Sequence, residues 1–503
     1  MPVADATAPD LDAPGATEQV STNDQGPGPT DRSSGAASDD ARRRVRPRWF
    51  VIGLAVVVLG GWAIRLFYVW HWRQYTDFGG DPLYYHLGAK LLASGHGFIN
   101  PYAYARHLNV QAADHPPLYL LYLGVFSFLG MGTVTWHLLA STLLGAASIL
   151  VAGLAGREIV GPRAGLIAAV LVAIYPNTWR YDGMMLSETL VILMVLLSVW
   201  TAYRFWHDPS TWRLVAVAVV VGLGTLARSE LVLMAPFLVA PLALLTPGRA
   251  GRDPVSPRNS AGGGDDRAPG RGRASWRRRF ALLGLGALAF SAVVGPWVVF
   301  NLIRFDHPVV LSENLGGTLA TSNCDEVYYG DQVGYWNYFC GQRILEEHGI
   351  GPYEFKGASD RILRQEAIRY IVDHKSRVPE VVAARIGRIT GLYQPRQEAQ
   401  FDVYLENSEQ GVSNAGLATY YLMAVLAVAG AIVLRRRRET LLPLLAPIVT
   451  VIFTVALFYA ATRFRATAEG ALCVLAAVAI DAAIGAVARR RAAAVDPSAP
   501  IAA

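Results

Sequence analysis

Apolar runs separated by short polar or basic segments recur along the chain, and this pattern predicts a bundle of membrane helices. A helix needs about 20 predominantly apolar residues to cross the hydrocarbon core of a bilayer. Ten runs approach this length, at about residues 49–70, 134–156, 164–178, 188–203, 212–228, 230–246, 280–303, 417–434, 440–461 and 467–487. The sequence therefore predicts an all-α polytopic membrane protein with about ten transmembrane helices.

The stretch 118–156 could hold one crossing or two. Arg157 and Arg163 flank the break that follows it, and arginines beside apolar runs mark cytoplasmic loops. If both arginines lie inside, a single crossing fits. We therefore expect residues 118–129 to form a juxtamembrane or re-entrant segment.

Residues 82–94 carry Leu83, Leu87 and Leu91 at helical spacing, which predicts a helix with one apolar face. Such a helix is too short to cross a bilayer. We expect it to lie flat in the interface, where it could border a lipid substrate, although a plain connector is an equally good interpretation.

The polar and aromatic segment 304–416 is too long for a simple connection, so we expect a loop domain of mixed structure with helices near 354–375 and 379–389. The remaining boundaries follow from composition and from the apolar runs. In chain order we predict a disordered cytoplasmic tail (1–48), a transmembrane catalytic module (49–303) with a flexible cytoplasmic loop (247–279), an extracytoplasmic loop domain (304–416), C-terminal transmembrane helices (417–487) and a cytoplasmic tail (488–503).

Composition and charge agree with a membrane protein. The chain of 503 residues is 53% hydrophobic and 17% charged, which excludes an ordinary soluble enzyme. Its net charge of +6 does not indicate a nucleic-acid partner, because the arginines gather beside apolar runs. With ten spans every cluster of three or more arginines falls on the cytoplasmic side, and we place the protein in the plasma membrane.

Three cysteines are too few for a disulfide scaffold or a zinc site. Cys324 and Cys340 share the polar segment 304–416. They could form a disulfide if this segment faces an oxidising compartment, and we predict that they do.

Polar residues that could carry chemistry gather on the predicted outer face. Asp81 follows the first span, and a carboxylate there could deprotonate an acceptor hydroxyl. Arg463 and Arg465 could bind a phosphate through their planar guanidinium groups. The alternatives are that Asp81 caps the helix beginning at Pro82 and that the two arginines anchor lipid headgroups. The face also carries His86, His115, Asp182, Glu188, Arg228 and Glu230.

Several motifs resemble those of the GT-C glycosyltransferases. These are Arg65-Leu66-Phe67-Tyr68, Gly80-Asp81-Pro82 with Tyr85-His86, Gly95-His96-Gly97-Phe98, His115-Pro116-Pro117-Leu118-Tyr119, and Arg463-Phe464-Arg465, which is similar to an Arg-Tyr-Arg element. The resemblance is to the branch containing protein O-mannosyltransferases and lipid A aminoarabinose transferases. It covers roughly residues 50–303 and hardly extends to the outer domain.

The resemblance implies transfer of a sugar from a polyprenyl-phosphate donor on the outer face of the membrane, with Asp81 as the catalytic base. From the polar groups on this face and the motifs together, we predict as substrate-binding residues Tyr85, His86, His115, Asp182, Glu188, Arg228, Arg463 and Arg465. The acceptor would be a hydroxyl of a protein, a lipid or a cell-envelope glycan. A flippase or exporter of lipid-linked sugars and a structural scaffold are the competing hypotheses.

The loop Tyr181-Asp182-Gly183-Met184-Met185-Leu186 is similar to the Tyr-Asp-x-Asp-Met-Leu loop of oligosaccharyltransferases, but Met184 stands in place of the second aspartate. A thioether is a poor ligand for a hard divalent cation. We therefore expect no cofactor and favour a phosphate site that works without a metal, with a divalent metal as the weaker alternative.

Overall fold

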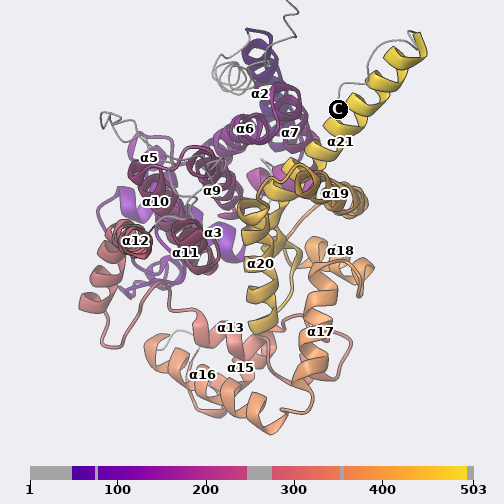
Figure 1. Ribbon diagram of the computed structural model, residues 1–503. Helices are drawn as coiled ribbons and strands as arrows, with labels where there is room; N and C mark the ends of the chain where they lie inside the picture. The colour runs from indigo at the N-terminus through magenta and orange to yellow at the C-terminus, as the bar shows by residue number, and fades with distance from the viewer. Residues whose placement is uncertain (1–47, 74–77, 246–274, 352–355, 496–503) are drawn as a thin grey trace, which may run out of the picture. The chain divides into compact units, whose positions relative to one another are not determined.

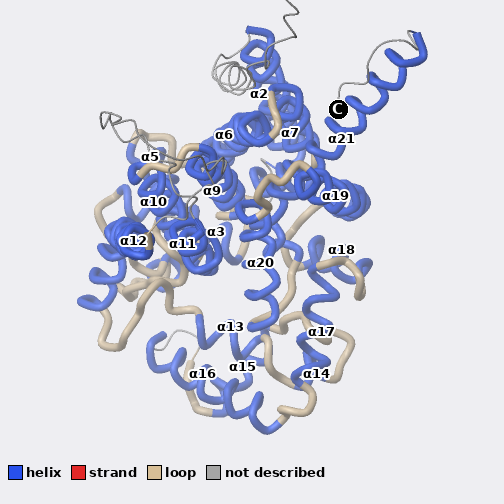
Figure 2. The backbone as a smooth tube through the Cα atoms, viewed as in Figure 1, coloured by secondary structure: helices blue, strands red, loops and turns tan. Residues whose placement is uncertain are grey.

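A computed structural model of the chain describes residues 48–73, 78–245, 275–351 and 356–495. The predicted tail 1–48, apart from Arg48, lies outside these residues, as do most of the predicted loop 247–279 and the end of the tail 488–503. Within the described ranges the elements are helices, joined by loops and turns, with no strand (Figure 2).

Six helices in the described part of the chain are long and apolar enough to cross a membrane. They are α2 (Arg48–Tyr68), α6 (Val134–Ile159), α9 (Glu188–His207), α12 (Trp276–Arg304), α19 (Gln410–Arg436) and α21 (Ala466–Val495). Four shorter apolar elements fall on the other predicted spans: α7 (Pro162–Ile174), α10 (Thr211–Ala227), the stretch η3 (Ser229–Leu233), η4 (Ala235–Val239) and α11 (Ala240–Leu245), and α20 (Leu442–Leu457). The chain is a multi-pass membrane protein, and about ten spans fit it.

The membrane helices pack as a bundle around α9, which contacts α6, α10 and α21. Helices α2, α6 and α7 lie side by side, as do α19 and α21 (Figure 1). Small residues allow the closest approach: a Cβ on Gly165 of α7 would lie 2.5 Å from the carbonyl oxygen of Gly153 of α6. Glycine at such crossings lets helix backbones approach closely where lipid supplies no hydrophobic driving force.

Short elements connect the ends of the spans. They are η1 (Val69–Arg73), α3 (Gly80–Ala93), α4 (Pro101–Tyr104), α5 (Leu118–Phe128), α8 (Pro176–Trp179), η2 (Arg180–Gly183) and η5 (Thr462–Arg465). Helix α3 covers the predicted interfacial segment and packs against α5. With 11 residues α5 is too short to span a bilayer, as expected for a juxtamembrane or re-entrant piece.

The predicted extracytoplasmic loop domain, called the outer domain below, is helical in its described residues, whereas the sequence suggested mixed structure. Its helices are α13 (Leu315–Thr321), α14 (Asp325–Tyr328), α15 (Tyr338–Glu347), α16 (Lys356–Asp373), α17 (Val378–Ile389) and α18 (Pro395–Tyr404). Helix α13 packs against α15 and α16, and α17 packs against α20 of the membrane part (Figure 1).

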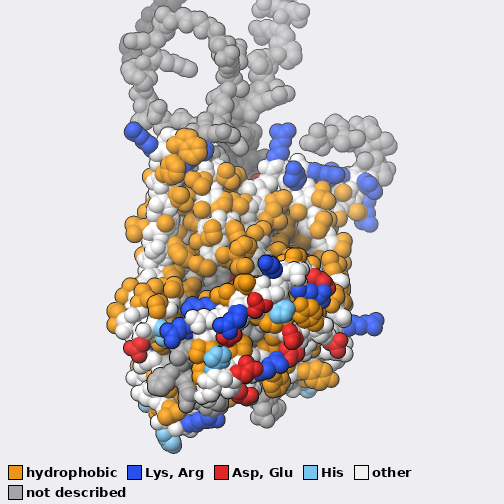
Figure 3. Space-filling view, turned by 90° about the horizontal axis from the view of Figure 1, so that it is seen from below, with side chains coloured by type: hydrophobic (Ala, Val, Ile, Leu, Met, Phe, Trp, Pro, Cys, Tyr) orange, Lys and Arg blue, Asp and Glu red, His pale blue; other side chains and the backbone are white. Residues whose placement is uncertain are grey.

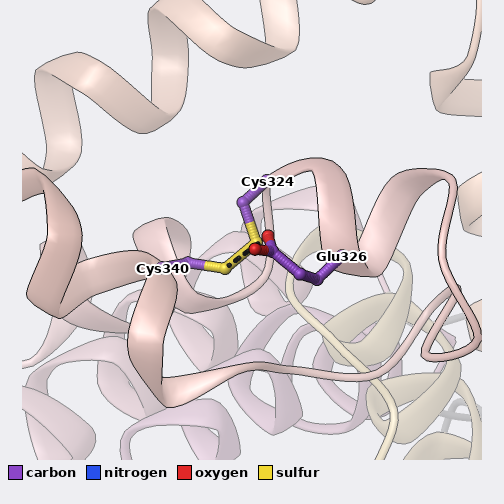
Figure 4. A group of neighbouring side chains, drawn as sticks. All are labelled: Cys324, Glu326 and Cys340. Carbon is purple, nitrogen blue, oxygen red and sulfur yellow. Dashed lines mark hydrogen bonds between the residues drawn. A yellow bond between two sulfur atoms is a disulfide. The ribbon is translucent and has the colours of Figure 1, made fainter.

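A disulfide joins Cys324, just before α14, to Cys340 in α15, with the two Cα atoms 6.2 Å apart (Figure 4). The two sulfurs pack with the buried side chains of Val327, Tyr328 and Val381. Because these helices are short, the disulfide fixes the outer domain where its apolar core is small.

The surface is divided by polarity. In Figure 3 apolar side chains cover one broad part of the face, and acidic, basic and histidine side chains gather on another. Exposed apolar side chains on α2, α12 and α19, such as Leu59, Leu288 and Val425, suit contact with lipid.

Candidate active site

A cavity of about 1170 Å³ lies between the membrane helices and the outer domain. The membrane part contributes the start of α3, the segment before α5, η3, the end of α20 and η5, and the outer domain contributes α13 and α15. Of the predicted site residues, Asp81, Tyr85, His115, Arg228 and Arg463 line it. The cavity therefore joins segments that are far apart in the sequence.

Asp81 lies in the first turn of α3, and its carboxylate points at Arg463 and His115. Its Oδ2 accepts a hydrogen bond of 2.7 Å from Nη2 of Arg463, and its Oδ1 lies 3.3 Å from Nε2 of His115. The helix has Gly79 as its N-cap and no side-chain capping bond. The capping interpretation of Asp81 is therefore not seen in the structure.

The charge of Asp81 is set by its partners. Burial raises the pKa of its carboxyl group, but the charges of His115 and Arg463 and their hydrogen bonds outweigh burial and hold the pKa well below its ordinary value. Asp81 is thus a carboxylate at neutral pH, with a third of its side chain exposed to the cavity.

Arg463 is bound by three carboxylates at once. Besides Asp81, it donates from Nε to Glu188 at 2.8 Å and from Nη1 to Glu406 at 3.2 Å. Glu188 is buried beneath the cavity and also pairs with Arg228, whose Nε lies 2.5 Å from Glu230. The site is a network in which carboxylates outnumber guanidinium groups.

Aromatic rings form the wall beside Asp81. The rings of Tyr85 and His115 lie 4.8 Å apart, and the ring of Tyr84 lies 5.2 Å from His115. Burial, and next the charge of Asp81, raise the pKa of Tyr85, so its hydroxyl remains protonated. These contacts hold the His115 imidazole against Asp81.

Four predicted site residues do not line this cavity. Glu188 still contacts Arg463, and the other three lie elsewhere. Arg465 donates to Glu469 at 2.7 Å, and its guanidinium carbon lies 3.7 Å from the centre of the Tyr420 ring. His86 is buried, with its Nδ1 3.1 Å from Nδ1 of His137. Their roles in binding substrate stay predictions that the geometry does not favour.

The third is Asp182, which pairs with Arg65 at 2.8 Å inside the bundle and accepts a bond of 2.9 Å from Thr189. Burial raises the pKa of Asp182 to about 7, against the lowering effect of Arg65. Met184 beside it is buried. The loop that resembles an oligosaccharyltransferase motif therefore packs within the protein rather than facing the cavity.

The predicted arginine pair is divided by local geometry. Arg463 and Arg465 both belong to η5, a 3₁₀ turn. With three residues per turn, two successive positions rotate a side chain by about 240° around the axis, so the two side chains point to different sides. Arg463 consequently faces the cavity and Arg465 faces Glu469.

Glu406 is the site residue that the sequence did not reveal. It lies in the segment 405–409 between α18 and α19, and no motif or periodicity distinguishes it from other acidic residues of the outer domain. Its role becomes visible through its contact with Arg463, which is 57 positions away.

In the described part of the chain, Cys324, Glu326 and Cys340 are close enough to suggest a metal site. The two cysteines are joined to each other, and Oε2 of Glu326 lies 3.3 Å from Sγ of Cys340 (Figure 4). A disulfide offers no thiolate ligand, so this group is not a metal centre.

Comparison with known proteins bears on this geometry. Residues 114–254 match the family model described as Dolichyl-phosphate-mannose-protein mannosyltransferase. No curated protein gave a significant match.

Among solved structures, the archaeal oligosaccharyltransferase AglB from Archaeoglobus fulgidus, in complex with an inhibitory peptide and a dolichol-phosphate, has 17% identity and a TM-score of 0.51. The match covers 90% of this chain and 52% of AglB, so the chain spans about half the length of that protein. ArnT from Cupriavidus metallidurans, bound to undecaprenyl phosphate, has 14% identity and a TM-score of 0.39, covering 88% of this chain and 80% of that one. AglB has the GT-C fold, and its likeness to this chain shows that the chain has the same fold.

Proposed function

We propose that the protein is a membrane glycosyltransferase that moves a sugar from a polyprenyl-phosphate donor to an acceptor hydroxyl on the extracytoplasmic face. The observation that carries the proposal is the pair of Asp81 and Arg463 in the wall of one large cavity. A base for the acceptor and a cation for a phosphate are the two groups that this reaction requires.

The reaction would be a single displacement. Asp81 takes the proton of the acceptor hydroxyl, whose oxygen forms a bond to the anomeric carbon of the donor sugar. The bond from that carbon to the phosphate oxygen breaks, and its electron pair leaves with the polyprenyl phosphate. Arg463 and Arg228 stabilise the charge that develops on this phosphate. An in-line displacement inverts the anomeric centre.

The dimensions of the cavity support two substrates. At about 1170 Å³ it exceeds the size usual for one small ligand. Val232, Leu233 and Leu457 at its membrane side suit the first isoprene units of a donor, while Asn314, Trp336 and Gln342 at the outer domain suit a polar acceptor. The acceptor would be a protein, a lipid or an envelope glycan.

The related structures add support at the level of the donor. AglB was solved with a dolichol-phosphate, and the family model that matches residues 114–254 is named for a dolichyl-phosphate-mannose enzyme. Both are lipid phosphates or their sugar derivatives, which is the class that an arginine beside a membrane cavity would bind.

The proposal is tested by a mass-spectrometric comparison of envelope glycans and glycoproteins from cells with the gene, without it, and with the Asp81→Asn variant. We expect one sugar modification to be present with the parent and absent in the other two. An unchanged set of glycans in all three would refute the proposal. Purified parent protein should release polyprenyl phosphate from the matching donor when the acceptor is present.

A further inference from the structure

We propose that Glu406 is a positioning residue that occupies Arg463 in the donor-free protein and gives this place up to the donor phosphate. The proposal rests on the proposed function, because it takes Arg463 as the ligand of that phosphate. Glu406, which lies in the segment 405–409, would thereby limit how tightly the donor binds.

The contacts of Arg463 leave little room for a phosphate unless a carboxylate withdraws. Its Nε, Nη1 and Nη2 atoms donate to Glu188, Glu406 and Asp81 respectively. A guanidinium has five N–H groups, and the two that remain are one on Nη1 and one on Nη2. A phosphate that takes a bidentate hold on these two nitrogens therefore competes with the carboxylates already bound to them.

Glu406 is the carboxylate that can leave at least cost. Its oxygens lie 3.2 and 3.4 Å from Nη1, which are longer than the 2.8 Å contact of Glu188 and the 2.7 Å contact of Asp81. Glu188 is also fixed by Arg228 and by its place in α9, and Asp81 by its place in α3. Glu406 lies in a turn.

The side chain of Glu406 can exchange without movement of its backbone, because its neighbours hold the segment 405–409. Arg73 donates from Nη1 to the carbonyl oxygen of Asn407 at 2.7 Å and to Glu409 at 2.9 Å. The hydroxyl of Tyr68 donates to Glu409 at 2.5 Å. Replacing Glu406 should thus leave the segment in place.

The electrostatic environment of Glu406 also favours its displacement from Arg463. Burial raises the pKa of Glu406, against the lowering effect of Arg463. Its charge is thus disfavoured by burial, and it lies near Asp81 and Glu188, which repel it. The donor is a phosphodiester with a single negative charge, so it can replace the Glu406 carboxylate on Arg463 without adding charge to the site.

The test uses the full-length protein in nanodiscs and an unsubstituted polyprenyl phosphate as the binding probe, followed by donor kinetics. Glu406→Gln should bind the probe about tenfold more tightly and lower the donor KM with little change in kcat, because a neutral amide competes poorly for Arg463. A merely structural role would instead weaken binding and lower kcat. Glu406→Asp, which keeps the charge but shortens the reach, should give a smaller gain and serves if the amide variant fails to fold.

Glu346→Gln is the matched control. Glu346 lines the same cavity and bonds to Gln342 at 2.7 Å in α15, so its replacement removes one negative charge without altering Arg463. We expect less than a twofold change in affinity. Equal gains for Glu346→Gln and Glu406→Gln, or no gain with either Glu406 variant, would overturn the inference.

Arg463→Gln separates this inference from the function on which it rests. If Arg463→Gln loses the probe while the Glu406 variants bind as the parent does, the exchange fails and the phosphate site stands. If Arg463→Gln binds the probe as well as the parent does, Arg463 is not the phosphate ligand and both ideas fail.

Discussion

Asp81 and Arg463 lie 382 positions apart and form an ion pair of 2.7 Å in the cavity wall. The pair connects the start of α3 with η5, just before the last membrane helix. It ties the base and the phosphate ligand of the proposed reaction to one another. The occupancy of Arg463 therefore controls the basicity of Asp81.

Asp81→Asn is expected to reduce sugar transfer by about a hundredfold or more while donor binding is retained, because asparagine has the shape of aspartate but cannot accept the proton. Turnover of a polyprenyl-phosphate sugar and binding of polyprenyl phosphate measure the two effects. Near-normal turnover would remove Asp81 from the mechanism.

The pH profile of the donor-free enzyme should show no titration of Asp81 between about pH 4 and 7, since Arg463 and His115 hold its pKa well below the ordinary value. A lowered pKa stabilises the fold above the pKa of the unfolded chain, and this contribution is lost as the pH falls through the folded value. Arg463→Gln removes one cause of the lowering. In that variant residual kcat/KM should fall at a higher pH than in the parent, and identical acid limbs would contradict this account.

Arg465→Gln is expected to destabilise the fold by about 3 kcal/mol, because the buried Glu469 loses its cationic partner and keeps only the neutral donors Tyr175 and Asn177. Thermal unfolding in detergent measures the loss, and adding Glu469→Leu to an Arg465→Met variant should recover much of it. Arg463→Gln should weaken donor binding, which Arg465→Gln should leave unchanged. An Arg465→Gln protein of parental stability that no longer binds donor would restore the two-arginine phosphate site.

The turn between α17 and α18 should lie in the bilayer. Gly391 accepts a bond of 2.6 Å from the Tyr421 hydroxyl of α19, and Leu392 is 83% exposed. A helix needs about 20 residues of 1.5 Å each to cross the hydrocarbon core. If Arg435 marks the cytoplasmic end of this crossing in α19, the outer edge of the core lies near Ala415. Tyr421 then lies within the core. A nitroxide at position 392 should be more accessible to oxygen than to a water-soluble nickel complex.

Two exposed positions calibrate that measurement. Val428 in α19 should report a lipid environment, and Val372 in α16 should report water. A label at Leu392 that behaves like the label at Val372 would place the turn in solution.

Removing the disulfide should destabilise the outer domain. The bond closes a loop between residues 16 positions apart, for which chain entropy predicts about 3 kcal/mol. Cys324→Ser with Cys340→Ser should therefore lower the unfolding temperature, and a reductant should do the same to the parent. Free thiols in the purified parent would contradict both the bond and the predicted extracytoplasmic location of residues 304–416.

The helices were largely predictable and the site was only partly so, for different physical reasons. Apolar runs such as 134–156 must be helical in lipid, since each backbone group needs a partner within its own segment. A single span length cannot tell which way a polar side chain points at its end. Arg463 and Arg465 looked equivalent in sequence, and the 3₁₀ turn separates them.

His86 and Glu406 illustrate the two kinds of failure at the site. His86 lies next to Tyr85 in a motif, yet successive residues of α3 point in different directions, and His86 meets His137 in the bundle instead. Glu406 reaches the site through tertiary contact alone, so its neighbours in sequence carry no signal of it.

Two contacts limit where this protein can be joined to a relative in a chimera. Arg180 pairs with Asp402 at 2.8 Å, and Arg73 bonds to the segment 405–409. These contacts hold the residues after about Asp402 to the membrane bundle, although the sequence analysis placed residues up to 416 in the loop domain. A chimera that exchanges the outer domain should be joined within α18, before Asp402. A junction at residue 416 would import a foreign carboxylate, or none, in place of Glu406.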